Sequence, residues 1–250
     1  MDSVGTTSVN NATASWSVWT NRNDNVPDTG AYENIISEDN GTLIRGIYHT
    51  TSGATTNQIT FFHIWSGSSP EWETNAGTSQ AWHHIGVTYN RGATTNDPVI
   101  YIDGTSVAFT EITAPSGTAN TGQNNLRLGE DIGGADDFDG TIAHVAIWNV
   151  ILAAGEMQAL SRGVSPFRIR PGNLVHYLPL YGRSAEQDLR AAGVTYTVTG
   201  TTIVAGPPRV QPPFAGYEGW PGAFTAAGAP PAGWAHLLSS TRNRLVYVQR

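Results

Sequence analysis

The chain has 250 residues, of which 13% are charged and 39% are hydrophobic, and its net charge is −7. Charged residues make up about 25% of an average globular protein, so Thr, Ser, Asn and Gly must cover much of this surface. The acidic balance and the lack of a basic patch in the sequence argue against nucleic-acid binding. The absence of Cys excludes disulfides and thiolate metal sites.

The sequence contains no signal for membrane insertion or for a cleaved leader. No apolar run approaches the ~20 residues that a membrane-spanning helix needs. Residues 1–16 have neither the basic region nor the apolar region of a signal peptide. We therefore expect no membrane span.

Short segments of alternating or β-branched residues, separated by turn residues, recur along the chain and predict strands. In chain order these are residues 14–20, 32–37, 43–48, 58–65, 81–89, 98–102, 105–109, 125–129, 141–149, 174–180 and 194–204. Helix formers at residues 153–162, ended by Gly163, predict one short helix. Residues 66–78 are interpreted as a polar loop. Many short strands with frequent turns are typical of an antiparallel sandwich or barrel.

One tight turn is predicted with a specific geometry. Asp103 and Gly104 follow a β-branched run and precede another extended segment. Asp-Gly favours a type I′ turn because both central residues of that turn need a positive φ. The pair therefore predicts a hairpin.

The composition changes after Gly206, where seven Pro residues occur between residues 207 and 231. A disordered linker seldom carries many aromatic residues, so we interpret residues 206–250 as an arm that packs either on its own domain or on a neighbouring subunit. Its aromatic contacts would be Phe214, Tyr217, Trp220, Trp234 and Tyr247. The last strand, predicted at residues 243–249, has no evident local partner, which favours pairing with a neighbouring subunit and a homo-oligomer.

Four blocks of sequence occur in a family-specific order: residues 82–89, 101–104, 138–149 and 152–159. Together they resemble the laminin-G-like, or concanavalin A-like, jelly-roll domains over residues 10–165. The resemblance implies an all-β, two-sheet antiparallel jelly-roll sandwich with one short helix. It divides the chain into a sandwich at 1–166, closing strands at 167–205 and a Pro-rich arm at 206–250.

The same superfamily contains laminarinase-type glycoside hydrolases, whose motif places three acids on one strand as Glu-x-Asp-x-x-Glu. Such enzymes need two carboxylates on either side of the bond that is cleaved. Here Glu71 and Glu73 are two residues apart but lack the third acid. The sequence therefore favours a protein that is not an enzyme, and a hydrolase is the less favoured alternative.

A loop rich in acidic residues and Gly lies at residues 130–140. Carboxylates in such a loop suit Ca²⁺, which prefers oxygen ligands. Asp131, Asp136, Asp137 and Asp139 are the candidate ligands, and turn formation is the simpler explanation. Ca²⁺ is the only cofactor that the sequence leaves open.

Aromatic residues near loops are candidates for sugar binding, because Trp and Tyr combine a flat apolar face with a polar group. The candidates are Tyr48, Trp65 and Trp72, with core packing as the alternative for each.

The segment after residue 165 is similar to extensions on such domains in tailed-phage proteins. That similarity implies a virion accessory protein, such as a capsid decoration, fibre or tail-tip component. Its partners would be other virion proteins, further copies of itself and a host-surface glycan. The alternative is a secreted bacterial lectin or adhesin at the cell surface.

Overall fold

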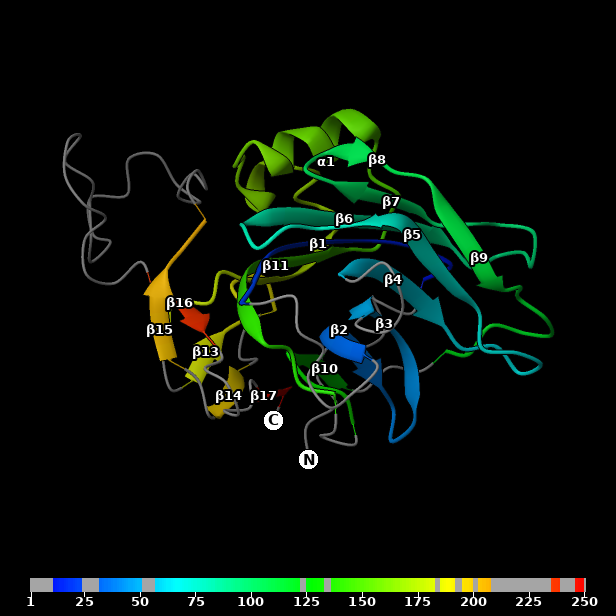
Figure 1. Ribbon diagram of the computed structural model, residues 1–250, viewed down its shortest axis with the longest axis horizontal. Coiled ribbons are helices and arrows are strands. Elements are labelled where there is room, and N and C mark those ends of the chain that lie inside the picture. Colours follow the sequence, from blue (N-terminus) through cyan, green and yellow to red (C-terminus); the bar gives the residue numbers. More distant parts are fainter. Residues whose placement is uncertain are drawn as a thin grey trace.

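The computed structural model describes residues 11–23, 32–50, 57–121, 125–132, 136–182, 185–191, 195–199, 202–207, 235–238 and 246–249 (Figure 1). These residues form two facing antiparallel sheets, a small third sheet and one α-helix. The predicted all-β jelly-roll sandwich is confirmed. No helix among the described residues is both long and apolar enough to cross a membrane.

Sheet A has eight strands. Along the sheet they are β15 (Thr202–Ala205), β16 (Ala235–Leu238), β11 (Gly140–Trp148), β1 (Thr13–Arg22), β6 (His83–Asn90), β7 (Val99–Ile102) and β8 (Thr105–Ser106), with β12 (Leu174–Leu178) also paired to β11. The predicted strands at 14–20 and 81–89 thus lie side by side in the middle of the sheet.

Sheet B has six strands, and the third sheet has three. Sheet B runs β10 (Asn125–Leu128), β2 (Tyr32–Asp39), β3 (Leu43–Thr50), β4 (Gln58–His63), β5 (Glu71–Gly77) and β9 (Phe109–Thr113). The third sheet runs β13 (Ala185–Gln187), β14 (Thr195–Thr199) and β17 (Val246–Gln249).

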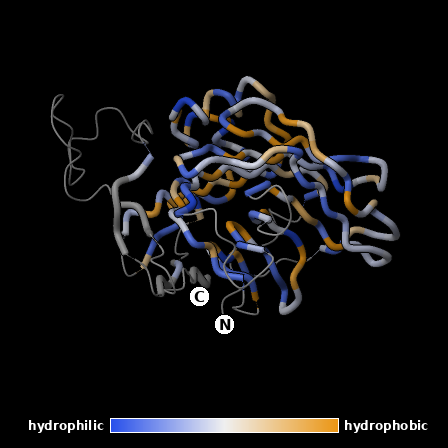
Figure 2. The backbone as a smooth tube through the Cα atoms, viewed as in Figure 1, coloured by the Kyte–Doolittle hydropathy of each residue, from blue (hydrophilic) through white to orange (hydrophobic). Residues whose placement is uncertain are grey.

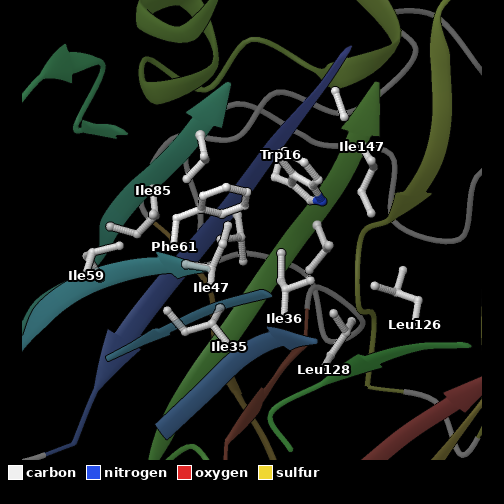
Figure 3. Close-up of a cluster of buried hydrophobic side chains, with 14 of the residues drawn as sticks. Trp16, Ile35, Ile36, Ile47, Ile59, Phe61, Ile85, Leu126, Leu128 and Ile147 are labelled. Carbon is white, nitrogen blue, oxygen red and sulfur yellow. The ribbon is translucent and has the colours of Figure 1, made fainter. Parts of the chain in front are cut away.

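The main core lies between sheets A and B. Trp16 and Ile147 of sheet A meet Phe61 and Ile47 of sheet B, as Figure 3 shows, and all four are buried. Hydrophobic stretches accordingly concentrate on the packed strands in Figure 2. Burial of apolar side chains from both inner faces is the main stabilising term of such a sandwich.

A second core forms on the other face of sheet A, beneath helix α1 (Ala154–Ser161) (Figure 1). Met157 and Leu160 of the helix are buried with Trp148. The Asp103–Gly104 turn lies against this helix and has φ values of 52° and 78°, so the predicted positive-φ hairpin turn is confirmed.

Strand β11 departs from simple alternation at one point. Ile142 packs in the main core and Trp148 in the second core, although an even spacing predicts one face for both. His144 has φ 50°, and the pairing with β1 shifts register between Ser17 and Trp19. A β-bulge places one extra residue in a strand and thereby reverses the facing of the residues after it.

Two segments differ from the expectation. Residues 71–77, interpreted as a loop, form β5 between β4 and β9. The last strand pairs with β14 of the same chain, with Tyr247 opposite Val198. The expectation that this strand lacks a partner in its own chain is therefore wrong, because the Thr- and Val-rich segment before it supplies one.

Candidate functional site

The outer face of sheet B, which points away from sheet A, carries the candidate site. Successive side chains of a strand point to opposite faces of the sheet, so one buried residue shows which way its neighbours point. Trp72 is buried in the main core, so its neighbours Glu71 and Glu73 point outward. Phe61 likewise points inward, which places Thr60 on the outer face.

The strand register brings five outward residues into one row. Asn34 of β2 pairs with Tyr48 of β3, which pairs with Thr60 of β4. Thr60 pairs with Glu73 of β5, and Glu73 with Thr110 of β9. Neighbouring strands are about 4.8 Å apart, so the row spans roughly 19 Å.

Tyr32 provides an exposed aromatic surface at one end of this row. Its side chain is 42% exposed, and its ring lies 4.8 Å from that of Tyr48 at an interplanar angle of 68°. Tyr48 in turn lies 5.7 Å from Phe62. Such edge-on packing fixes the ring of Tyr32 while leaving part of it open to solvent.

Polar groups continue from the aromatic cluster across the face. The hydroxyls of Thr50 and Thr60 are 2.8 Å apart, and Thr60 donates to Glu73 Oε2 at 3.5 Å. Burial raises the pKa of Glu71, a hydrogen bond from Tyr48 opposes that rise, and the carboxylate of Glu73 adds to it. Burial also raises the pKa of Tyr48, which therefore remains protonated at neutral pH.

The outer face has an acidic character. Both Arg residues on the strands of sheet B are engaged with carboxylates: Arg45 with Glu38 inside the sandwich, at 2.7 Å, and Arg127 with Asp39, at 2.8 Å. Glu73 and Glu71 are thus not balanced by an Arg from these strands. The face thus combines the exposed ring of Tyr32 with the half-buried carboxyl groups of Glu71 and Glu73, which can accept hydrogen bonds.

The aromatic residues predicted as sugar platforms lie elsewhere in the packing. Trp72 is fully buried, and Trp65 and Tyr48 are 5% and 6% exposed. Their prediction as exposed platforms is wrong. Trp72 belongs to the main core because its position in β5 faces sheet A, and Trp65, which follows β4, packs into the same core. Tyr32, which the sequence interpretation passed over, is the exposed ring, and Tyr48 supports it.

The predicted calcium ligands lie within the acidic loop, on either side of residues 133–135, which are outside the described part. Asn23 Nδ2 donates to Asp139 Oδ1 at 2.7 Å, and Asp139 is buried. Burial raises the pKa of Asp136, and nearby Asp131 adds to that effect. Within the described residues, no group of three His or acidic side chains is arranged to hold a metal ion. Asp137 is half-buried.

The aromatic residues assigned to the arm are Phe214, Tyr217, Trp220 and Trp234, and they lie outside the described residues. Of the segment 206–250, strand β16 pairs with β11 and β15, and β17 pairs with β14. The segment therefore contributes strands to the sheets of its own chain.

Strand β5 contains the two acidic residues that the hydrolase alternative would use. Glu71 and Glu73 share the outer face, as two acids of a Glu-x-Asp-x-x-Glu strand would. The position three residues after Glu73 is Ala76. The face therefore holds two adjacent carboxylates without the third acid of that motif.

A family profile of the concanavalin A-like lectin/glucanases superfamily matches residues 3–158. The chain therefore belongs to this superfamily, as its resemblance implied. A search of curated protein sequences finds no match.

Solved structures share the fold at low sequence identity. A candidate carbohydrate-binding protein from Bacteroides ovatus is 16% identical with a TM-score of 0.50, over 71% of this chain and 49% of its own. This chain thus spans about half of that protein. The sialidase module CBM40 of Ruminococcus gnavus, bound to α2,3-sialyllactose, is 14% identical with a TM-score of 0.47, over 62% and 85%. A heptameric pentraxin of Limulus polyphemus is 11% identical with a TM-score of 0.43, over 60% and 70%. At these identities the similarity shows the fold alone.

Proposed function

We propose that this protein is a lectin module that binds neutral saccharides on the outer face of sheet B without cleaving them. The observation that carries the proposal is the exposed ring of Tyr32 beside a row of hydrogen-bonding side chains on a sheet. An aromatic ring held in place by its neighbours loses little freedom when a ligand stacks on it. Membership in the lectin/glucanase superfamily supports the same function.

The row next to Tyr32 supplies the polar half of such a site. Glu73 is half-buried and Thr110, next to it in the row, is exposed, so a carboxylate and a hydroxyl reach solvent, whereas Thr50 and Thr60 are buried beside them. Sugar hydroxyls both donate and accept hydrogen bonds, so they match this mixture. Hydrogen bonds to a charged acceptor are stronger than neutral ones, which makes Glu73 the main polar anchor.

The negative charge of Glu73 favours neutral saccharides over acidic ones. A sialic or uronic acid carboxylate placed about 5 Å from Glu73 would be repelled by up to about 3 kcal/mol at the surface of a protein. Tyr32 and the Thr residues impose no such cost on a neutral sugar. We therefore assign neutral hexoses and their oligomers as ligands.

Cleavage of the bound sugar is not part of the proposal, because Ala76 stands where the third acid of the hydrolase motif would be. The virion role, the location in a phage particle and the alternative location at a bacterial surface stay predictions of the sequence. Mass spectrometry of a purified particle would test them.

The test is a glycan array followed by calorimetry with lactose and α2,3-sialyllactose. We expect lactose or another neutral glycan to bind and its sialylated form to bind at least tenfold more weakly. Tyr32→Ala should weaken neutral binding by about fivefold, since the stacking of aromatic groups contributes around 1 kcal/mol. Glu73→Gln should reduce the difference in affinity between lactose and α2,3-sialyllactose, because it removes the charge that repels the sialic acid.

Val99→Ala is the matched control, because Val99 is 41% exposed on sheet A, far in the fold from the outer face of sheet B. Failure of every glycan to bind would overturn the proposed function. Equal binding of neutral and sialylated sugars would leave a lectin but remove the assigned selectivity.

A further inference from the structure

Three side chains at the edge of the sandwich form a continuous hydrogen-bonded chain. Ser79 Oγ lies 2.8 Å from His83 Nε2, and His83 Nδ1 lies 2.7 Å from Asp103 Oδ2. Ser79 belongs to the connection between β5 and β6, His83 begins β6, and Asp103 is in the turn between β7 and β8. The fold therefore brings Asp103 to Ser79 and His83, which lie close together in the sequence.

The carboxylate of Asp103 is held in place from two sides. The backbone N–H of His84 donates to Asp103 Oδ1 at 2.9 Å, and the N–H of Asp103 donates to the carbonyl of His84 at 2.8 Å. Partial burial would raise the pKa of Asp103, but the hydrogen bonds from His83 and His84 bring it below its usual value. Asp103 is therefore ionised at neutral pH.

An ionised Asp103 decides which nitrogen of His83 carries the proton. The carboxylate only accepts hydrogen bonds, so Nδ1 of His83 must donate to it. In the neutral ring, Nε2 is then the acceptor, and it faces the hydroxyl of Ser79. This is the arrangement in which a His can take a proton from a Ser nucleophile.

The group is open to solvent. Ser79 is exposed and the side chain of His83 is 19% exposed, so a small ester can reach both. Two partial counterparts in the described part of the chain are buried: Ser17 bonds His84, and His176 bonds Asp188. The first pair contains a Ser and a His without an Asp, and the second contains a His and an Asp without a Ser. Both pairs are buried, so an ester cannot reach either of them.

We propose that Ser79 is a nucleophile that accepts acyl groups from esters, with His83 as its general base and Asp103 as the positioning residue. This activity is separate from saccharide binding and does not depend on it. Ser79 Oγ attacks the ester carbonyl carbon while its proton passes to His83 Nε2. The bond to the leaving oxygen breaks and the proton passes to the leaving group. Water, deprotonated by His83, then attacks acyl-Ser79 and releases the acid with free Ser79.

The composition of the chain suits a direct test. Lys amines and Cys thiols, which react with activated esters in most proteins, are both absent. The probe is p-nitrophenyl acetate, incubated with the full chain. The readouts are release of p-nitrophenolate and the position of the acetyl group by peptide mass spectrometry. We expect acetyl groups on Ser79.

Four variants separate catalysis from structure. Ser79→Ala should remove the acetylated position. His83→Ala should lower the rate by about 10²-fold or more, as expected for loss of a general base, and added imidazole should restore part of it. Asp103→Asn should also lower the rate with an unchanged unfolding temperature, because Asn-Gly suits the same turn. Ser106→Ala, at another exposed Ser, is the control and should change nothing.

The proposal is overturned if Ser79 gains no more acetyl than Ser106. It is also overturned if Ser79 is acetylated equally fast in the His83→Ala and Asp103→Asn variants. In either case, the three residues only tie the β5–β6 connection to the β7–β8 turn. Loss of glycan binding in the same preparations would have no bearing on this outcome.

Discussion

Replacing Glu38 by Gln tests the ion pair that is enclosed between the two sheets. Glu38 Oε1 accepts from Trp16 Nε1 at 2.8 Å, and Oε2 accepts from Arg45 Nη2 at 2.7 Å. Arg45 also lies 4.8 Å from the ring centroid of Trp16. Trp16 belongs to sheet A and the two charged residues to sheet B, so the cluster joins the sheets.

The expected cost of Glu38→Gln is set by burial. The amide would keep the shape of the side chain and could still accept from Trp16, but Arg45 would lose its carboxylate partner. Removing one partner of a buried ion pair costs about 3–5 kcal/mol. For a chain of this size that lowers the unfolding temperature by roughly 6–20 °C.

Urea unfolding followed by circular dichroism measures this loss. The control is Arg170→Gln, which breaks a pair with Glu156 at 2.7 Å that is partly exposed. Pairs at the surface contribute at most about 1 kcal/mol. If Glu38→Gln costs no more than this control, the buried pair does not stabilise the sandwich and the reasoning fails.

Four further predictions concern packing, pH and calcium. A Cβ on Gly46 would lie 2.4 Å from Ile36 O, so Gly46→Ala should lower the free energy of unfolding by about 1–3 kcal/mol. Gly155 has open space in helix α1, so Gly155→Ala should raise it by up to about 1 kcal/mol in the same urea assay. Burial lowers the pKa of His49 and His63 from 6.5 to about 3. Below pH 6.5 these two His residues are therefore protonated in the unfolded chain but stay neutral in the folded chain. As the pH is lowered from about 6.5 to about 3, the free energy of unfolding should fall by up to about 1.4 kcal/mol per pH unit for each His. A urea midpoint that does not change across this range would contradict the prediction. Calorimetric titration with Ca²⁺ should give no saturating heat, and a one-to-one isotherm that Asp136→Asn removes would show a calcium site.

The sequence predicted most strands whose inward residues are large and apolar. The alternation of residues 83–89 and the Asp103–Gly104 turn are both present as expected. Strand β5 was missed because only Trp72 marks its inner face strongly, while Glu71 and Glu73 gave it the composition of a loop. Charged residues on the outer face of an antiparallel sheet are compatible with a strand, so alternation was the better guide.

The bulge in β11 shows a limit of alternation itself. An extra residue at His144 moves Ile142 and Trp148 to opposite faces. No Gly marks the position, although a positive φ is unusual for a residue with a side chain. The matching register shift is in the pairing with β1, which lies far away in sequence.

The position of the candidate site also depends on which side chains of each strand point inward and which point outward. Shifting a strand by one residue exchanges its two faces, so a shift of β5 would bring Trp72 outward and bury both Glu residues. The large apolar surface of Trp72 opposes that shift, as does its packing 5.9 Å from the ring of Phe61. Core packing thereby fixes Glu71 and Glu73 on the outer face. The buried Trp72, which the sequence suggested as a sugar platform, instead positions the carboxylates beside which a sugar would bind.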